Sequence, residues 1–528
     1  MPKAISFDRF DYGLDLRKGL STSDANRLRV LRNAHATEGK TIRKRPGLTK
    51  ITTLEAGTVG LFTGLGKLNT FYGGTATVTH ANTLFAPRRV PNTANQASPV
   101  TEVHYADVFN GFIYGAIQYG SGAITHHYLD DPGAWAASTA YTLGQFRIPT
   151  TANGYRYEIT TAGTSAATQP TWPTTIGATV TDGTAVWTCR TFMVTDAFCP
   201  HTRQVTKITS KIWSIGVNGD TVRFSATNAP RDWTTANNAG FLPVGLQNSS
   251  SGVATALGFY TNRLVAFFSD AAQVWQVDVN PANHSFLQSV DVGTNLPYSH
   301  ANMAGDVLFL SSSGVRSITR QDVTTNLIDS DIGSPIDREL LKGLAGLFGF
   351  NLTTAKAQYY RGGGQYWLYS GTRALVYTFS RTAKISAWSL YEYPFSLDYM
   401  DELNNEMYIR SGNNVYKVDR DIKTDDGVLY QVDIEMAYLD FKAPGVLKQI
   451  LGMDAVVTGT CSISHRYDAR NTSLKSDPPV TIIGDSRPGN TFPVELLATN
   501  LAPVISNFDN ADFELHQLTY YYEPLGVM

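Results

Sequence analysis

The sequence predicts an all-β fold: a β-propeller that carries a small inserted β module and is followed by a C-terminal β-sandwich. A recurring hairpin cassette, a composition rich in turn residues and one interruption of the cassette series support this prediction. In each cassette an apolar run leads into a Gly, Ser or Asn turn, and an alternating apolar and polar strand follows. Because one hairpin cannot bury its own apolar face, serial copies must pack against each other.

The clearest cassettes begin at Leu264–Phe268, Tyr366–Tyr369 and Met407–Ile409, and a turn follows each of them within two residues. Weaker copies include the Asn218-Gly219 turn, which is a strong hairpin signal. All the turns together fall near residues 74, 121, 219, 270, 313, 371 and 412. Most gaps are roughly 40–60 residues, which is typical of a four-stranded propeller blade. One or two ordinary β-sandwiches remain the alternative, because hairpins occur in every all-β fold.

The composition of the 528 residues is that of a globular protein, with 42% hydrophobic and 17% charged residues. The 45 glycines favour turn-rich β structure, and a net charge of −2 gives no global reason to bind nucleic acid or a membrane. The three cysteines have no zinc-type spacing, which predicts a reducing compartment. No signal-peptide pattern and no long apolar run are present, so we expect synthesis in the cytosol without a membrane-spanning segment.

Residues 1–50 are predicted to form a basic entry segment, in which Leu28–Arg32 could be a helix or a strand, and Val30 with the short length of the run favours a strand. A basic strip precedes and enters the Arg-Pro-Gly turn of this segment, and it consists of Lys40, Arg43, Lys44 and Arg45. Such a strip could contact DNA phosphates, an acidic neighbouring protein or only solvent. Since it lacks interleaved aromatic residues and a groove-reading element, a protein neighbour is favoured. From residue 428 onward acids outnumber bases, and opposite charges at the two ends suit a subunit with different partners on each side.

The propeller is assigned to residues 51–133 and 193–420, and residues 134–192 are assigned to the inserted module. Removing the module restores the blade spacing, as expected for an insertion in a surface loop. The module is dense in aromatic residues, and its candidate glycan-binding side chains are Trp135, Tyr155, Trp172 and Trp187. Exposed rings would stack on sugars, whereas buried rings would form the core of a very small domain. Trp172, which lies between prolines, is the best candidate for an exposed ring.

A helix is predicted at Ser334–Phe350, with Ser334 as N-cap and leucines at helical spacing that pack one face on the body. Glycines inside this segment weaken the helix. A charged linker at Arg420–Gly427 leads to residues 428–528, where alternating strands and Pro or Gly turns predict a separate β-sandwich.

No catalytic or phosphate-binding motif occurs in the sequence, which therefore supports no enzyme, cofactor or metal site. His126 and His127 are adjacent on a predicted strand and point to opposite faces, so they read as a satisfied surface pair. Three groups of acids lie in turns, where aspartate is common: Asp329-Ser-Asp331, Asp398 with Asp401, and Asp425-Asp426. None has the spacing of an EF-hand loop.

The N-terminal segments Phe10–Leu14, Leu31–Ala34 and Gly39–Gly47 resemble the opening of bacteriophage tail-tube and nozzle proteins. The order of propeller and C-terminal β region is most similar to the tail nozzle, or packaged-DNA stabilisation, proteins of short-tailed phages. The segment Trp135–Trp187 resembles small carbohydrate-binding-like modules that decorate phage structural proteins.

This resemblance implies a homo-hexameric ring below the portal and adaptor proteins of a virion tail, near the tail fibres or spikes. Such a ring, assembled in the host cytoplasm, retains packaged double-stranded DNA and conducts it during ejection. A lumen of neutral and acidic side chains would let DNA slide, because each phosphate–cation contact adds salt-dependent retention. The alternatives are a virion adhesin that binds host surface glycan through the inserted module, and a propeller glycosidase, which would need two carboxylates suitably spaced.

Overall fold

The computed structural model describes residues 2–21, 23–74, 78–90, 98–130, 132–247, 252–303, 305–319, 331–476 and 478–527. Almost all regular structure in these ranges is β, so the all-β prediction is confirmed. The helical elements whose bounds are fully described are short: α2 (Asp337–Leu340) and the 3-10 turns Thr235–Asn237, Val244–Gln247, Pro281–Asn283, Gly343–Ala345, Leu352–Thr354 and Arg361–Gly363. Within the part of the chain described, no helix is long and apolar enough to cross a membrane.

The chain divides into two compact units. The blade unit contains residues 52–297 together with 399–403, and the terminal unit contains residues 1–51, 298–398 and 404–528. The predicted propeller segments, 51–133 and 193–420, are therefore shared between the two units, and the inserted module belongs to the blade unit.

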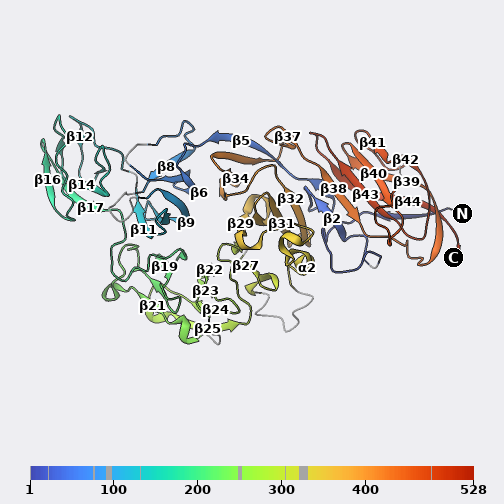
Figure 1. Ribbon diagram of the computed structural model, residues 1–528, viewed down its shortest axis with the longest axis horizontal. Helices are drawn as coiled ribbons and strands as arrows, with labels where there is room; N and C mark the ends of the chain where they lie inside the picture. Colours follow the sequence, from blue (N-terminus) through green and yellow to red (C-terminus); the bar gives the residue numbers. More distant parts are fainter. Residues whose placement is uncertain are drawn as a thin grey trace. The chain divides into compact units, whose positions relative to one another are not determined.

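The blade unit is a series of small sheets, each built from strands that follow one another in the chain (Figure 1). The first two sheets contain β6 (Val59–Gly64), β7 (Lys67–Tyr72) and β8 (Phe85–Arg89), then β9 (Val100–Phe109), β10 (Phe112–Tyr119) and β11 (Ile124–Leu129). The next contains β18 (Val205–Ile208), β19 (Lys211–Ile215), β20 (Val222–Phe224) and β21 (Gly240–Leu242). The fourth contains β22 (Ala256–Tyr260), β23 (Arg263–Phe267), β24 (Ala272–Gln276) and β25 (Ser285–Val290). This sequential strand order is that of propeller blades.

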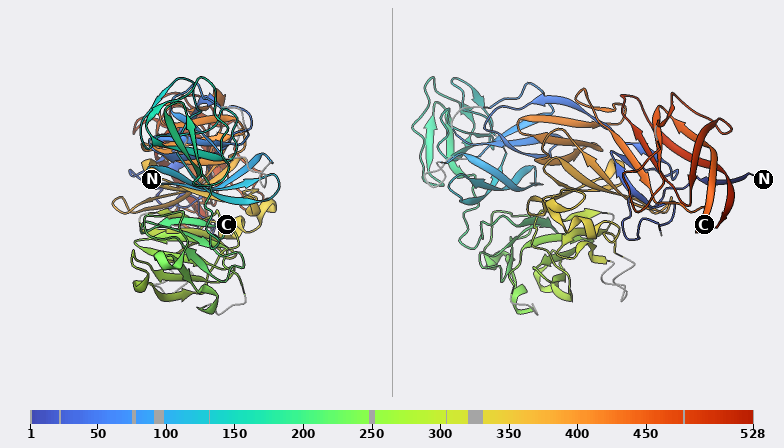
Figure 2. Two further views of the ribbon diagram at one scale, coloured as in Figure 1. Left: turned by 90° about the vertical axis from the view of Figure 1, so that its left-hand side faces the viewer. Right: turned by 45° about the vertical axis from the view of Figure 1, so that its right-hand side comes forward.

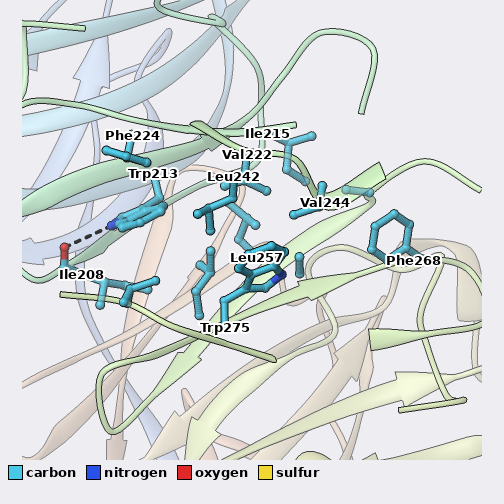
Figure 3. Packing of buried hydrophobic residues seen from close by; sticks show 14 of the residues in the cluster. Ile208, Trp213, Ile215, Val222, Phe224, Leu242, Val244, Leu257, Phe268 and Trp275 are labelled. Carbon is cyan, nitrogen blue, oxygen red and sulfur yellow. Dashed lines mark hydrogen bonds between the residues drawn. The ribbon is translucent and has the colours of Figure 1, made fainter. Parts of the chain in front are cut away.

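Successive sheets bury their apolar faces together, as the cassette pattern predicts. A core formed by β18–β21 and β22–β25 includes Trp213, Phe224, Leu257 and Trp275 (Figure 3). The Trp213 indole N–H donates to the Ile208 carbonyl oxygen at 3.1 Å, so this buried polar group keeps a partner. Neither sheet could bury these rings by itself, which explains why the cassette recurs.

The strands of the inserted module lie between β11 and β18 in the chain (Figure 1). One sheet has the order β13 (Phe146–Arg147), β14 (Tyr155–Thr161), β17 (Ala185–Thr191) and β16 (Thr179–Asp182), and a short pair joins β12 (Ala140–Tyr141) to β15 (Gly163–Thr164). The aromatic residues of the module form a core of their own.

The terminal unit begins, after the N-terminal strands, with β26 (Ala301–Met303), β27 (Asp306–Ser311) and β28 (Gly314–Ser317). A larger sheet runs β29 (Lys356–Tyr360), β30 (Gln365–Ser370), β31 (Arg373–Ser380), β32 (Ile385–Glu392), β2 (Leu28–Arg32), β38 (Val432–Met436), β43 (Ala502–Asn507), β40 (Cys461–Arg466) and β41 (Val480–Ile482). A third runs β34 (Glu406–Ser411), β35 (Asn414–Asp419), β5 (Gly47–Thr53), β36 (Thr424–Asp425) and β37 (Val428–Leu429). β33 (Tyr399–Leu403) belongs to the blade unit.

N-terminal strands complete the C-terminal sandwich. Its second sheet runs β3 (Ala34–Ala36), β4 (Ile42–Lys44), β44 (Glu514–Val527), β39 (Val446–Thr458) and β42 (Thr491–Ala498), and β1 (Lys3–Phe7) also pairs with β44. Figure 2 shows β1 beside the C-terminal strands. The His465 Nε2 and Tyr520 Oη atoms lie 3.0 Å apart and join the two sheets. Residues 428–528 therefore form their sheets together with N-terminal strands, and Leu28–Arg32 is confirmed as a strand.

The predicted helix at Ser334–Phe350 is wrong. After α2 the chain turns at Gly343 and Gly349, whose φ angles are +60° and +50° and lie in the left-handed region. At Gly346, a Cβ atom would lie 2.2 Å from the Glu339 carbonyl oxygen. The glycines therefore end the helix instead of only weakening it.

Candidate functional site

The basic strip lies on the hairpin of β3 and β4, and this hairpin is embedded in the sandwich. β4 pairs with β44 through Ile42–Leu515 and Arg43–Glu514. Side chains alternate along β4, so Lys44 points into the protein while Arg43 faces the solvent. The alternation separates Arg43 from Lys44, because adjacent residues of a strand point to opposite faces.

Arg45 is fully buried, and its guanidinium contacts a carboxylate, two tyrosine rings and a side-chain amide oxygen. Its guanidinium donates to both carboxylate oxygens of Asp425, at 2.8 and 2.5 Å. The rings of Tyr430 and Tyr393 lie 3.8 and 4.3 Å from the guanidinium carbon, and Nε donates to Asn33 Oδ1 at 3.1 Å. The guanidinium is thus neutralised, hydrogen-bonded and stacked, which are the conditions under which a buried arginine is tolerated.

Lys44 is also fully buried. Its ammonium donates to Asn507 Oδ1 at 2.8 Å and to the Asp509 carbonyl oxygen at 2.6 Å. Burial lowers the pKa of Lys44 to about 8, although the nearby Asp509 carboxylate opposes the shift.

Lys44 and Arg45 therefore cannot touch DNA or a neighbouring protein, and this part of the prediction is corrected. The two remaining cations of the strip are partly exposed, but they pair within the chain: Arg43 with Asp512, and Lys40 with Asp11 at 3.5 Å. The strip fastens the N-terminal segment to the C-terminal strands instead of offering four free cations.

The aromatic side chains of the module gather around one carboxylate. Trp135 and Trp187 are buried, and both indole N–H groups donate to Asp182 Oδ2, at 2.7 and 2.9 Å. Trp172 is buried as well, with its ring centroid 4.2 Å from that of Tyr157. The expectation that Trp172 is exposed is wrong, because the ring fills the core of the module.

Of the four candidate glycan-binding residues, Tyr155 alone is half-buried instead of buried. It begins β14 and packs against the module core. A sugar-stacking platform needs several exposed rings, and these four residues do not present one. Asp182, the shared acceptor of two indoles, was not among the site residues predicted from the sequence.

His126 and His127 are buried instead of lying on the surface, and they do point to opposite faces of β11. His126 Nδ1 lies 2.7 Å from Tyr114 Oη, and His127 Nε2 lies 2.9 Å from Tyr119 Oη. Burial lowers the pKa of both imidazoles to about 3, so both are neutral at physiological pH. The surface assignment failed because β11 is covered on both faces.

The stability of the blade unit is expected to fall as the pH drops below about 6.5, the ordinary histidine pKa. The unfolded chain takes up a proton at His126 and His127 in that range, whereas the folded chain does so only near pH 3. Each histidine contributes up to about 1.4 kcal/mol of destabilisation per pH unit. Denaturant titrations at several pH values between 7.5 and 5 measure the slope. His127→Gln is expected to reduce it, while His516→Gln, at a partly exposed position, serves as control.

Several of the acids that the sequence singles out have structural partners. Asp425 pairs with Arg45, and Asp398 Oδ2 accepts from the Gly412 amide at 2.7 Å. Asp401 accepts from the Thr63 amide at 2.6 Å, and burial raises its pKa to about 6. Asp329 lies outside the described residues. In the described ranges, no three His, Cys, Asp or Glu side chains come together as a group that could hold a metal ion.

The comparisons with known proteins do not identify a family for this chain. No protein-family model matches the chain, and no curated protein matches it. Among solved structures, the chain is similar to the Pan2 WD40 domain of Neurospora crassa, at 9% sequence identity. That similarity covers 61% of this chain and 89% of the WD40 chain, with a TM-score of 0.26, which is too low to support any conclusion about function.

Proposed function

We propose that this chain is a structural protein of a bacteriophage tail, a nozzle-type subunit that forms a ring around packaged DNA, retains it and conducts it during ejection. The observation that carries the proposal is the role of the Arg-Pro-Gly turn, the motif on which the resemblance depends. Arg45 of this turn lies between the rings of Tyr393 and Tyr430, which we call the tyrosine cage. Gly47 of the same turn packs closely, since a Cβ atom there would lie 2.3 Å from the Thr424 carbonyl oxygen. The motif thus fastens the N-terminal segment to the strands that follow the blades.

The blade-type sheets also support this proposal. Serial sheets of consecutive strands, all antiparallel except for the parallel pair β7 and β8, bury apolar faces together and build a rigid scaffold. A subunit of this kind works by assembling, and a ring joins its subunits through two different surfaces. The net charge of −2 is compatible with a channel that does not hold DNA tightly.

The adhesin alternative depends on exposed aromatic rings in the inserted module. Trp135, Trp172 and Trp187 are all buried, so no specific observation favours it.

Negative-stain electron microscopy of the purified full-length chain tests the proposal. We expect a sixfold annulus with an axial opening. Elongated trimers, or monomers at every protein concentration, would contradict it. A higher-resolution map of the annulus would test the lumen as well, since a continuous basic lining is incompatible with sliding DNA.

A further inference from the structure

An apolar patch faces the solvent in the segment that follows α2. Leu341, Leu344 and Leu347 have exposed fractions of 38, 71 and 58%. Two exposed cations lie beside these leucines, Arg338 in α2 and Lys342 directly after Leu341. We call these five residues the leucine patch. Three exposed leucines within seven residues are unusual for a surface that meets only water.

The leucine patch is held in place by the terminal unit. Leu340, Phe348 and Phe350 are buried and anchor the segment on both sides of the leucines. Arg316 Nη1 donates to Asp337 Oδ2 at 2.6 Å, and Arg373 donates to the Phe348 carbonyl oxygen. The leucines are therefore presented by a fixed backbone, which lowers the entropic cost of binding a partner.

A second surface with the opposite charge lies on the outer face of the sandwich. Gln449 of β39 pairs with Leu497 of β42 on one side and with Glu523 of β44 on the other, so the three side chains share one face. Leu497 is 54% exposed, and Leu451, at the β-bulge of β39, is 39% exposed.

Glu495 is exposed two residues before Leu497 and therefore points to the same side of β42. We call Leu451, Leu497, Glu495, Glu523 and Gln449 the acidic sheet face. Like the leucine patch it combines exposed leucines with charges, but here the charged residues are acids.

We propose that the leucine patch of one copy of this chain binds the acidic sheet face of the next copy, head to tail. This inference rests on the proposed ring and names its interface. The two surfaces lie on different parts of the same chain, as a heterologous contact requires. Arg338 and Lys342 would face Glu495 and Glu523, while the leucines bury one another.

The charges also argue against a contact between two identical surfaces. Two leucine patches would bring cations together, and two acidic sheet faces would bring carboxylates together. Glu339, beside the leucine patch, pairs with Lys342 at 2.6 Å, and two cations against this one carboxylate leave the surface with a positive balance. Contact between a leucine patch and an acidic sheet face is thus favoured both by the burial of leucines and by the opposite charges.

Paired substitutions in the leucine patch test the interface. Leu344→Glu with Leu347→Glu is expected to weaken self-association about a hundredfold or more, because it places unpaired charges in the contact. Both side chains are exposed, so the fold should persist. The matched control is Leu143→Glu with Leu246→Glu, two leucines that are 70 and 84% exposed elsewhere on the chain. Mass photometry and sedimentation velocity of the full chain measure the assembly.

Mixing gives a signature that general destabilisation would not produce. A chain with Leu344→Glu and Leu347→Glu keeps its acidic sheet face, and a Leu497→Glu chain keeps its leucine patch. Each variant alone is expected to be monomeric, and the mixture to form dimers that cannot extend.

Arg338→Glu with Lys342→Glu is expected to weaken assembly about tenfold, and adding Glu495→Lys with Glu523→Lys should restore it.

The outcomes separate this inference from the proposed function. If the wild-type chain forms rings and the leucine-patch variant forms them equally well, the interface is wrong and the ring proposal stands. If the mixture of single-surface variants stays monomeric, the pairing is also wrong. A wild-type chain that never assembles would overturn both.

Discussion

Arg45→Met is expected to lower the free energy of unfolding of the terminal unit by about 3–5 kcal/mol, which is the usual cost of removing one partner of a buried ion pair. The substitution leaves the Asp425 carboxylate buried without its cation, and the Tyr393 and Tyr430 rings lose the guanidinium between them. Arg45→Lys is expected to rescue only part of the loss, since an ammonium cannot bind both carboxylate oxygens in a planar fork. Chemical denaturation monitored by circular dichroism measures the change.

Arg43→Met, two positions away, is the matched control. Its ion pair with Asp512 is partly exposed, and such pairs contribute about 0–1 kcal/mol. A similar loss in the two variants would contradict the assignment of Arg45 as the internal fastening of the N-terminal segment. In a second test, Arg45→Met combined with Asp425→Leu removes both charges. It is expected to be more stable than Arg45→Met alone, because no unpaired carboxylate remains.

Trp187→Ala is expected to destabilise the inserted module by about 3–5 kcal/mol, the usual cost of deleting a fully buried large aromatic side chain. The ring touches Trp172 and Tyr141 at centroid distances of 5.6 and 4.9 Å, and its N–H donates to Asp182. In so small a core, no neighbouring side chain can fill the cavity. Limited proteolysis of residues 134–192, followed by mass spectrometry, should show faster cleavage than in the wild-type chain.

Leu143→Ala, at an exposed position in the same module, is expected to leave the cleavage rate unchanged. Equal cleavage of Trp187→Ala and wild type would show that the module does not depend on this core. Glycan-binding assays must be interpreted with the same stability in mind. Loss of binding in a Trp135, Trp172 or Trp187 variant would report an unfolded module and would not identify a sugar-stacking ring.

Local patterns in the sequence predicted the elements that depend on neighbouring residues. The hairpins around Gly371 and Gly412 form where the turn residues lie, and the φ angles of these glycines are positive. The strand at Leu28–Arg32 also follows from side-chain alternation within a short window. Blade-type sheets follow from the same logic, since each one uses consecutive strands.

The candidate site could not be predicted in the same way. Arg45 and Asp425 are 380 residues apart, so their ion pair leaves no local pattern in the sequence. The basic strip has the same sequence whether its side chains face the solvent or are buried against tyrosine rings. Exposure of Trp172 was expected from its flanking prolines, but its burial depends on Tyr157 and Trp187, which arrive from other strands. The glycines after α2 were treated as weak points of a helix, and the contacts that make them turns involve Glu339 and Arg373.

By itself the sequence determined that this chain is all-β, that its hairpins come in series and that a compact module interrupts them. Only the tertiary structure decided which cations are free, which aromatic rings are exposed and that N-terminal strands complete the C-terminal sandwich. The physical reason is the range of the interactions. Turn chemistry and side-chain alternation act over a few residues, whereas burial is set by segments that meet only after the chain has folded.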